Sequence, residues 1–214
     1  LTIFFVLAAV FFAKSKPTLS AITLAIGALV KPQAGFIAPV LAILWFKKYG
    51  LVRTIINTFL SAAIFVAGFA PFANGKNIFS FVLERLEVTA NQYPYASVNA
   101  FNFWSLVGGL WQKDDLTKFL GLALVVLVLG FITFIFLKRK NKISQLTHIP
   151  IYESSRIYLL TAIYFLLTFM FLTRMHERHL LPVLAPLAIT AVEFPLLWIP
   201  YALLSITYIL NLQY

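Results

Sequence analysis

Eight long apolar runs, separated by short breaks that carry charge or proline, constrain this chain more than any other feature. A helix needs about 20 apolar residues to cross the ~30 Å hydrocarbon core of a bilayer, and three of the runs meet or approach that length. We expect all the runs to be helical, because backbone in lipid must satisfy its own hydrogen bonds and no alternating barrel pattern appears. The predicted fold is an all-α polytopic bundle of about seven or eight membrane helices, some of them short or broken. The runs are residues 1–13, 19–30, 34–46, 54–72, 119–137, 157–173, 180–192 and 196–212.

Composition excludes the soluble classes of protein. Hydrophobic residues make up 61% of the chain and charged residues 11%, whereas about a quarter of a typical soluble domain is charged. The net charge of +10 is better explained by membrane topology than by nucleic-acid binding, so the expected partner is the lipid bilayer. The chain has no cysteine, which excludes disulfides and thiol nucleophiles.

Basic residues gather at three of the breaks and predict the orientation of the chain. By the positive-inside rule these clusters are cytoplasmic, and so is the connector 138–156. The segment 74–118 has four basic and four acidic residues, so we expect it outside, with residues 78–88 as a short helix on the membrane surface. Asp114 and Asp115 within it predict a solvated helix start. The clusters are Lys14 and Lys16; Lys47, Lys48 and Arg53; and Lys138, Arg139, Lys140 and Lys142, with Arg156 beyond.

Pro32 predicts where the chain turns back. If both flanks of residues 19–46 are cytoplasmic, the chain must enter the membrane and return, and Pro32 interrupts a helix at that point. The alternative is one tilted helix kinked at Pro32, which would place Lys14 and Lys16 outside. We favour the reversal.

The chain begins inside an apolar run, at Leu1, without Met and without the basic region of a signal peptide. We therefore expect a fragment of a longer protein, forming a single transmembrane domain over residues 1–214 that lacks its amino-terminal part.

Two polar features of the breaks suggest an anion site. Lys31 lies between two apolar runs, where it either snorkels to the interface or faces a phosphate, with Gln33 beside it. The second feature is the break 173–179, which contains Arg174, His176, Glu177, Arg178 and His179. Its arginines could hold phosphate oxygens and its histidines could donate or shuttle protons. The alternative interpretation is a salt-bridged link between helices.

Metal binding has little support in this break. Glu177 could orient a neighbouring group or ligate a divalent metal ion, but His176 and His179 are three residues apart and do not form the zinc-protease pattern. We assign no metal ligand and no resident cofactor.

Residues 91–105 combine aromatic and amide side chains. They predict either an interfacial aromatic belt or a partly buried sugar or lipid site. In the second case aromatic rings would stack against the ligand and amides would bind its hydroxyls. The stacking candidates are Tyr93, Tyr95 and Trp104, and the amide candidates are Asn99 and Asn102.

Three motifs resemble, in order, those of bacterial mannosyltransferase-like membrane proteins of the GT-C glycosyltransferase superfamily, which are related to the GPI-anchor mannosyltransferases. The motifs are ALVKPQA at 28–34, followed by Pro39; YPYASVNAFNFW at 93–104; and RMHERHLLP at 174–182. The resemblance implies a GT-C-like bundle in the bacterial plasma membrane. It also implies an enzyme that transfers a mannose or other hexose from a polyprenyl-phosphate donor on the extracytoplasmic side, with inversion at the anomeric carbon.

The resemblance also implies roles for individual residues. Lys31 and Gln33 would lie at the donor phosphate, and Arg174, His176, Glu177 and Arg178 would line the same cavity. The catalytic base of such enzymes is an acid in the first outer loop, which would precede Leu1, so none of the acids here is assigned to it. The sugar and the acceptor, whether glycan, lipid or protein, stay open.

Two other functions compete with glycosyl transfer. A broken helix with a central lysine is also found in transporters, so a transporter or flippase of a lipid-linked or anionic solute is the main alternative. A non-catalytic membrane subunit is the third.

Overall fold

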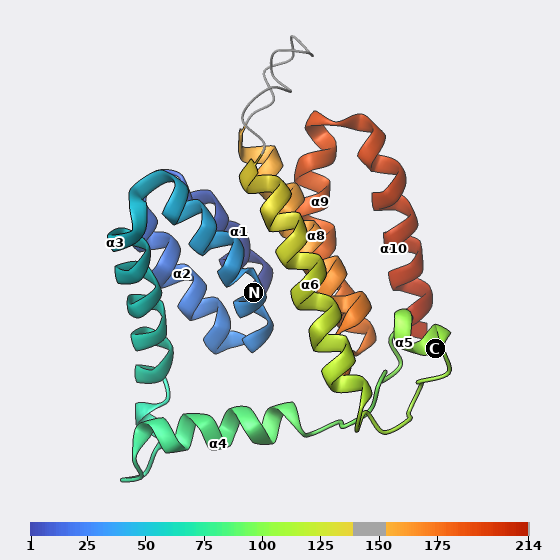
Figure 1. Ribbon diagram of the computed structural model, residues 1–214, viewed down its shortest axis with the longest axis horizontal. Coiled ribbons are helices and arrows are strands. Elements are labelled where there is room, and N and C mark those ends of the chain that lie inside the picture. The colour runs from blue at the N-terminus through green and yellow to red at the C-terminus, as the bar shows by residue number, and fades with distance from the viewer. Residues whose placement is uncertain (139–152, 214) are drawn as a thin grey trace. The chain divides into compact units, whose positions relative to one another are not determined.

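The computed structural model describes residues 1–138 and 153–213, and within these ranges the chain is helical without a β-strand. It forms two compact units, Leu1–Gln92 and Tyr93–Tyr214, each of which is described by itself (Figure 1). All eight apolar runs lie in helices. The all-α class is therefore confirmed.

Unit 1 consists of antiparallel helices that pack in sequence order. Here α1 packs against α2, and α2 against α3. The Ser20 hydroxyl on α2 donates to the Ala9 carbonyl of α1 at 2.6 Å, a bond between two buried groups. The elements are α1 (Thr2–Ala13), α2 (Pro17–Val30), η1 (Pro32–Ile37), α3 (Ala38–Ala67), η2 (Ala70–Phe72) and α4 (Ile78–Ala90).

The predicted reversal at Pro32 is confirmed. The last residue of α2 is Val30, Lys31 has an extended backbone (φ −156°, ψ 118°), and Pro32 begins the 3-10 turn η1. After this turn α3 returns against α2. A single helix kinked at Pro32 is excluded by this packing.

A second reversal occurs inside α3, at Gly50. Its φ of 78° and ψ of 178° are not helical and belong to a region that is essentially restricted to glycine. Beyond it the second limb of α3 runs back along α2, where the Ser61 hydroxyl donates to the Ala21 carbonyl at 2.9 Å. The turn lies close to the α1–α2 turn, because the Tyr49 hydroxyl donates to the Lys14 carbonyl at 2.5 Å. Two basic clusters, Lys14–Lys16 and Lys47–Arg53, therefore share one end of unit 1, as the charge pattern predicts.

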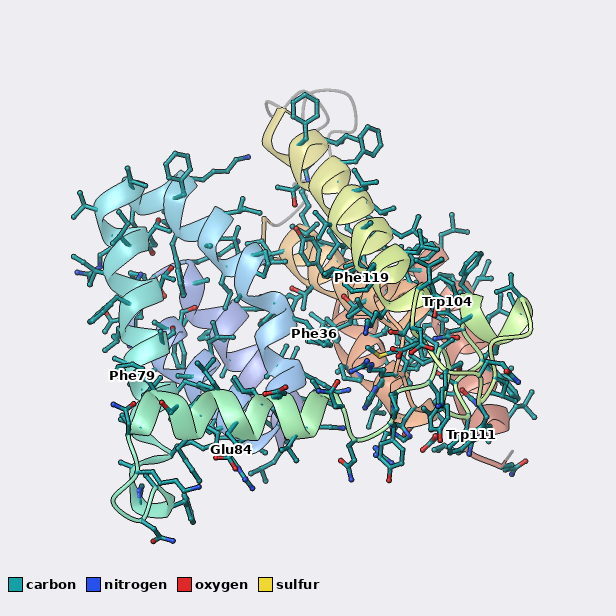
Figure 2. The ribbon with its side chains drawn as sticks, turned by 60° about the horizontal axis from the view of Figure 1, so that its bottom comes forward. Phe36, Phe79, Glu84, Trp104, Trp111 and Phe119 are labelled. Carbon is teal, nitrogen blue, oxygen red and sulfur yellow. The ribbon has the colours of Figure 1, made fainter. Side chains whose placement is uncertain are left out.

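The segment after α3 contains the expected short amphipathic helix. The side chain of Asn77 caps α4 by accepting from the amides of Phe79 and Ser80. Val82 is buried, whereas Phe79 and Leu83 are exposed. Phe79 and Glu84 point to different sides of the helix (Figure 2). The helical part of the prediction for residues 74–118 is confirmed, and its position on a membrane stays a prediction.

The described residues of unit 2 include four longer helices, α6, α8, α9 and α10. Helix α6 packs on α8, α8 on α9, and α9 on α10. The basic connector is placed only at its two edges, since Arg139, Lys140 and Lys142 lie outside the described residues. The elements are α5 (Phe103–Leu106), α6 (Thr117–Lys138), α8 (Glu153–Phe171), η3 (Glu177–Leu180), α9 (Leu181–Glu193), η4 (Pro195–Leu197) and α10 (Trp198–Gln213).

By length and composition alone, three helical segments in the described part of the chain are long and apolar enough to cross a membrane: Pro32–Phe72, which Gly50 divides into two limbs, Thr117–Ile135 and Pro195–Gln213. Exposed large side chains such as Phe59, Leu127 and Leu203 give these helices apolar outer surfaces. The chain therefore has the character of a membrane protein. Seven or eight crossings remain a prediction, because helices such as α1, with 12 residues, are shorter than a perpendicular crossing requires.

Candidate functional site

Three loop segments at one end of unit 2 are joined by main-chain hydrogen bonds into what we call the loop cluster, residues 93–99, 109–114 and 173–179. The amide of Val98 donates to the Met175 carbonyl at 2.9 Å, and the amide of Arg174 donates to the Tyr95 carbonyl at 2.9 Å. Ala96 in turn donates to the carbonyl of Gln112 at 2.8 Å. Two of the predicted polar segments, 91–105 and 173–179, are thus brought together by the fold.

Gly109 allows the segment 109–114 to lie close to the backbone of Trp104 and to the side chain of Ala96. A Cβ at this position would lie 2.9 Å from the Trp104 carbonyl oxygen and 3.0 Å from the Cβ of Ala96. Because the first of these atoms is backbone, any larger residue here would displace the loop.

A buried ion pair anchors the cluster. Asp114 is 1% exposed. One of its carboxylate oxygens accepts from Nε of Arg174 at 2.6 Å and from the Thr173 hydroxyl at 3.0 Å, and the other accepts from Nη2 of Arg174 at 3.1 Å. The prediction that Asp114 is a solvated helix start is wrong. A carboxylate this buried requires a matched cation, and the residue that supplies it is 60 positions away in the sequence.

The ion pair changes the chemistry of both partners. Burial by itself raises the pKa of the Asp114 carboxyl, but the hydrogen bonds from Arg174 and Thr173 and the charges of Arg174 and Lys118 outweigh it and hold the pKa below its ordinary value. Arg174 was expected to bind the donor phosphate. Since the Arg174 guanidinium is engaged in a bidentate bond to Asp114, we assign to Arg174 the positioning of the loop 173–179 and not phosphate binding.

Backbone strain is concentrated in the cluster. Among the described residues of unit 2, Asn99, Trp111 and Arg174 are the non-glycine residues with positive φ, at 55°, 56° and 64°. Each left-handed residue of this kind costs on the order of 1 kcal/mol and persists only where its surroundings fix it. Such residues gather at binding and catalytic sites, which favours a functional role for these loops.

The histidines of the cluster lie next to the aromatic segment. The rings of His176 and Tyr93 are 4.8 Å apart between centroids and meet edge to face. His179 accepts at Nδ1 from the His176 amide at 3.3 Å, so it caps the 3-10 turn η3. His176 and Tyr93 therefore belong to one surface, and His179 supports the turn that presents them.

Arg178 and Glu177 form a loose pair on the same turn. Their closest charged atoms are 3.7 Å apart, and the Arg178 side chain is 53% exposed against 19% for Glu177. A pair at this separation and exposure binds weakly. The guanidinium of Arg178 can therefore exchange its carboxylate partner for a ligand anion at little energetic cost.

Trp111 is a candidate that the sequence interpretation missed. The residue is 46% exposed, and its indole donates from Nε1 to the Asn99 side-chain oxygen at 2.7 Å and lies 5.2 Å from the Tyr95 ring between centroids. The Gly108–Gly109 pair that precedes it was the available signal, because paired glycines mark a turn that can present a side chain.

Two predicted sugar contacts are structural. Trp104 is 5% exposed and donates its indole N–H to the Phe171 carbonyl at 2.8 Å. Asn102 is fully buried, donates to the Phe169 carbonyl at 3.2 Å, and caps the short helix α5 by accepting from the Ser105 amide. Because the polar atoms of both side chains are used within the protein, neither residue belongs to the candidate site.

Lys31 and Gln33 belong to unit 1. Lys31 is half-buried at the α2–η1 turn, and the side-chain oxygen of Gln33 is buried without a hydrogen-bond partner. A buried, unsatisfied amide oxygen is uncommon and is compatible with a ligand site. That these two residues line the same cavity as residues 174–178 stays a prediction.

Within residues 1–138 and 153–213 no group of three or more His, Asp or Glu side chains is arranged to hold a metal ion. Comparison with known proteins gave no match to any protein-family model, curated protein or solved structure.

Proposed function

We propose that this chain is part of a membrane glycosyltransferase. The enzyme would transfer a hexose from a polyprenyl-phosphate donor on the extracytoplasmic side of the bacterial plasma membrane. The observation that carries the proposal is the loop cluster. There, strained backbone fixed by the Asp114–Arg174 pair presents an exposed arginine, a histidine and aromatic rings at one end of an apolar helical unit. A phosphorylated lipid with a sugar head has the matching chemistry, since its tail is apolar, its linker anionic and its head group polar.

In this proposal the cations stabilise the leaving group. The bond between the anomeric carbon and the phosphate oxygen breaks, the acceptor hydroxyl oxygen bonds to that carbon, and negative charge builds on the departing polyprenyl phosphate. A preorganised guanidinium that pairs with this charge lowers the barrier without covalent chemistry. We assign this role to Arg178, with His176 as a hydrogen-bond donor beside it on the same turn. The acceptor proton goes to a base that we do not assign.

A transporter of the kind that the sequence suggested would need one helix broken around a central lysine. Lys31 instead lies at a turn between two antiparallel helices, α2 and α3. Transporters of this kind have two half-helices whose ends point at a binding site near the bilayer midplane. The helices on either side of Lys31 are antiparallel and do not form such a pair.

The proposal is tested by following donor cleavage with farnesyl phosphoryl mannose as a short-chain donor. The full-length protein is reconstituted in nanodiscs, and the release of farnesyl phosphate is measured by phosphorus NMR. Arg178→Ala should lower kcat/KM by about 5- to 150-fold, as loss of a charge-assisted bond of ~1–3 kcal/mol requires, and Arg178→Lys should recover part of it.

Arg85→Ala is the matched control, because Arg85 is also an exposed arginine bonded to a neighbouring glutamate, Glu84, but lies on α4. Equal losses in the Arg178 and Arg85 variants, or no donor cleavage by the unmodified protein, would contradict the proposal.

A further inference from the structure

Trp111 and Tyr95 form an exposed aromatic surface on the loop cluster, and we infer that this surface binds a hexose ring by stacking. The inference rests on the proposed function for the source of the hexose, which is either the donor or the acceptor. It assigns a sugar contact to Trp111 in place of the buried Trp104.

Trp111 is fixed at three points, which makes it a preorganised platform. Its backbone is held in the left-handed region, its indole N–H is bonded to Asn99, and its ring lies 5.2 Å from the Tyr95 ring between centroids, at an interplanar angle of 62°. Asn99 is itself held, since the side chain of the buried Asn211 donates to its carbonyl. Trp111 is 46% exposed, so close to half of this fixed residue stays accessible to a ligand. Figure 2 shows Trp111 on the outer part of the loops.

A hexose fits this surface because it is itself two-sided. One face of the ring carries C–H groups, which pack on an aromatic face, and the rim carries hydroxyls that need polar partners. The loop cluster also carries exposed residues with polar side-chain groups. They include Gln112, next to Trp111 in the sequence, and Tyr93, a residue that is 37% exposed. A hydrocarbon tail would leave those groups without a ligand partner.

A second aromatic pair shows what an ordinary surface pair looks like in this protein. Trp198 is 44% exposed and lies 5.2 Å from Tyr201 between ring centroids, so its exposure and spacing match those of Trp111 and Tyr95. However, both residues are on the apolar helix α10, without a left-handed backbone. Such a pair is typical of the aromatic belt at a membrane interface. It therefore supplies a matched control.

The test is saturation-transfer NMR on the full chain in nanodiscs, with methyl α-D-mannopyranoside, methyl α-D-glucopyranoside and methyl α-D-galactopyranoside as probes. We expect saturation at the C–H protons of one ring face for at least one of them. The signal should fall about fivefold in Trp111→Ala, persist in Trp111→Phe, and be unchanged in Trp198→Ala. Circular dichroism and an unchanged thermal midpoint show that Trp111→Ala is folded.

Absence of saturation with all three glycosides would overturn the inference, and so would equal losses in the Trp111 and Trp198 variants. Saturation of isoprenoid methyl protons of added farnesyl phosphate through Trp111, without hexose saturation, would identify a lipid-chain contact and overturn it as well.

Farnesyl phosphoryl mannose distinguishes the two sources of the hexose. If it displaces the methyl glycoside, the platform holds the donor sugar, and if the glycoside signal survives saturation with it, the platform holds the acceptor. Both outcomes support stacking. Binding of farnesyl phosphate alone, measured through its phosphorus resonance, distinguishes the proposed function from hexose stacking on Trp111. If farnesyl phosphate binds and no hexose saturation is seen, stacking on Trp111 is rejected while the proposed function still stands.

Discussion

At the residue scale, the Asp114–Arg174 pair decides whether the loop cluster holds its shape. Removing one partner of a buried ion pair leaves an uncompensated charge, which costs about 3–5 kcal/mol. Arg174→Ala should therefore lower the free energy of unfolding of unit 2 by about 2–4 kcal/mol, since its side chain is 22% exposed and water can partly replace it. Denaturant titration of the protein in detergent measures this loss. Arg178→Ala is the control, because its loose pair with Glu177 predicts a change below about 0.5 kcal/mol. Equal effects of the two substitutions would contradict the anchoring role.

The same pair predicts a dependence on acid. The pKa of Asp114 is lowered in the folded state, so its contribution to stability is fully present above the unfolded value of about 3.9 and is lost as the pH falls through the lower folded value. Hydrogen exchange at the amides of Val98 and Arg174, corrected for intrinsic rates, should show constant protection from pH 7 to about 4.5 and a decline below about 4. Asp114→Asn should remove this dependence. Protection that declines in step with amides of α6 would indicate global unfolding instead.

At the element scale, the break in α3 depends on Gly50. No atom lies within 4 Å of a Cβ built there, so any cost of Gly50→Ala comes from its backbone conformation alone. We expect a loss of about 1–3 kcal/mol, or straightening of α3, because alanine does not adopt this φ and ψ without strain. Gly35→Ala is the matched control, since it also has open space but no positive φ. Thermal unfolding of the variants in detergent measures the difference, and a neutral Gly50→Ala would show that the break is not fixed by this residue.

At the scale of the whole molecule, the absence of native cysteine makes topology directly measurable. Single cysteines at Lys16 and Lys48 should label from the same side, because one hydrogen bond joins the α1–α2 turn to the α3 break. A cysteine at Lys76, which follows the second limb of α3, should label from the opposite side. Membrane-impermeant maleimide on intact and on permeabilised cells gives the readout. Labelling of Lys16 and Lys48 from opposite sides would contradict the arrangement of unit 1.

Much of this architecture could be predicted from the sequence because it is set by local physics. Apolar runs and their breaks determined the helices, since a lipid-exposed backbone must close its own hydrogen bonds, and Pro32 predicted a reversal because proline cannot continue a helix. Clustered lysines indicated which turns share an end of unit 1. The charge pattern placed the segments 91–105 and 173–179 on the same side of the membrane, and main-chain hydrogen bonds join them in the fold.

Only the tertiary structure decided what the residues in those loops do. The sequence alone did not show that Arg174 is paired with Asp114, that Trp104 is covered, or that Trp111 is exposed. Each of these depends on contacts between segments tens of residues apart, and the free energy of a charge or an indole depends on its burial and partners more than on its neighbours in sequence. The sequence by itself determined a helical membrane protein with a polar loop region. Only the tertiary structure divided that region into a buried anchor, the Asp114–Arg174 pair, and an exposed surface around Trp111.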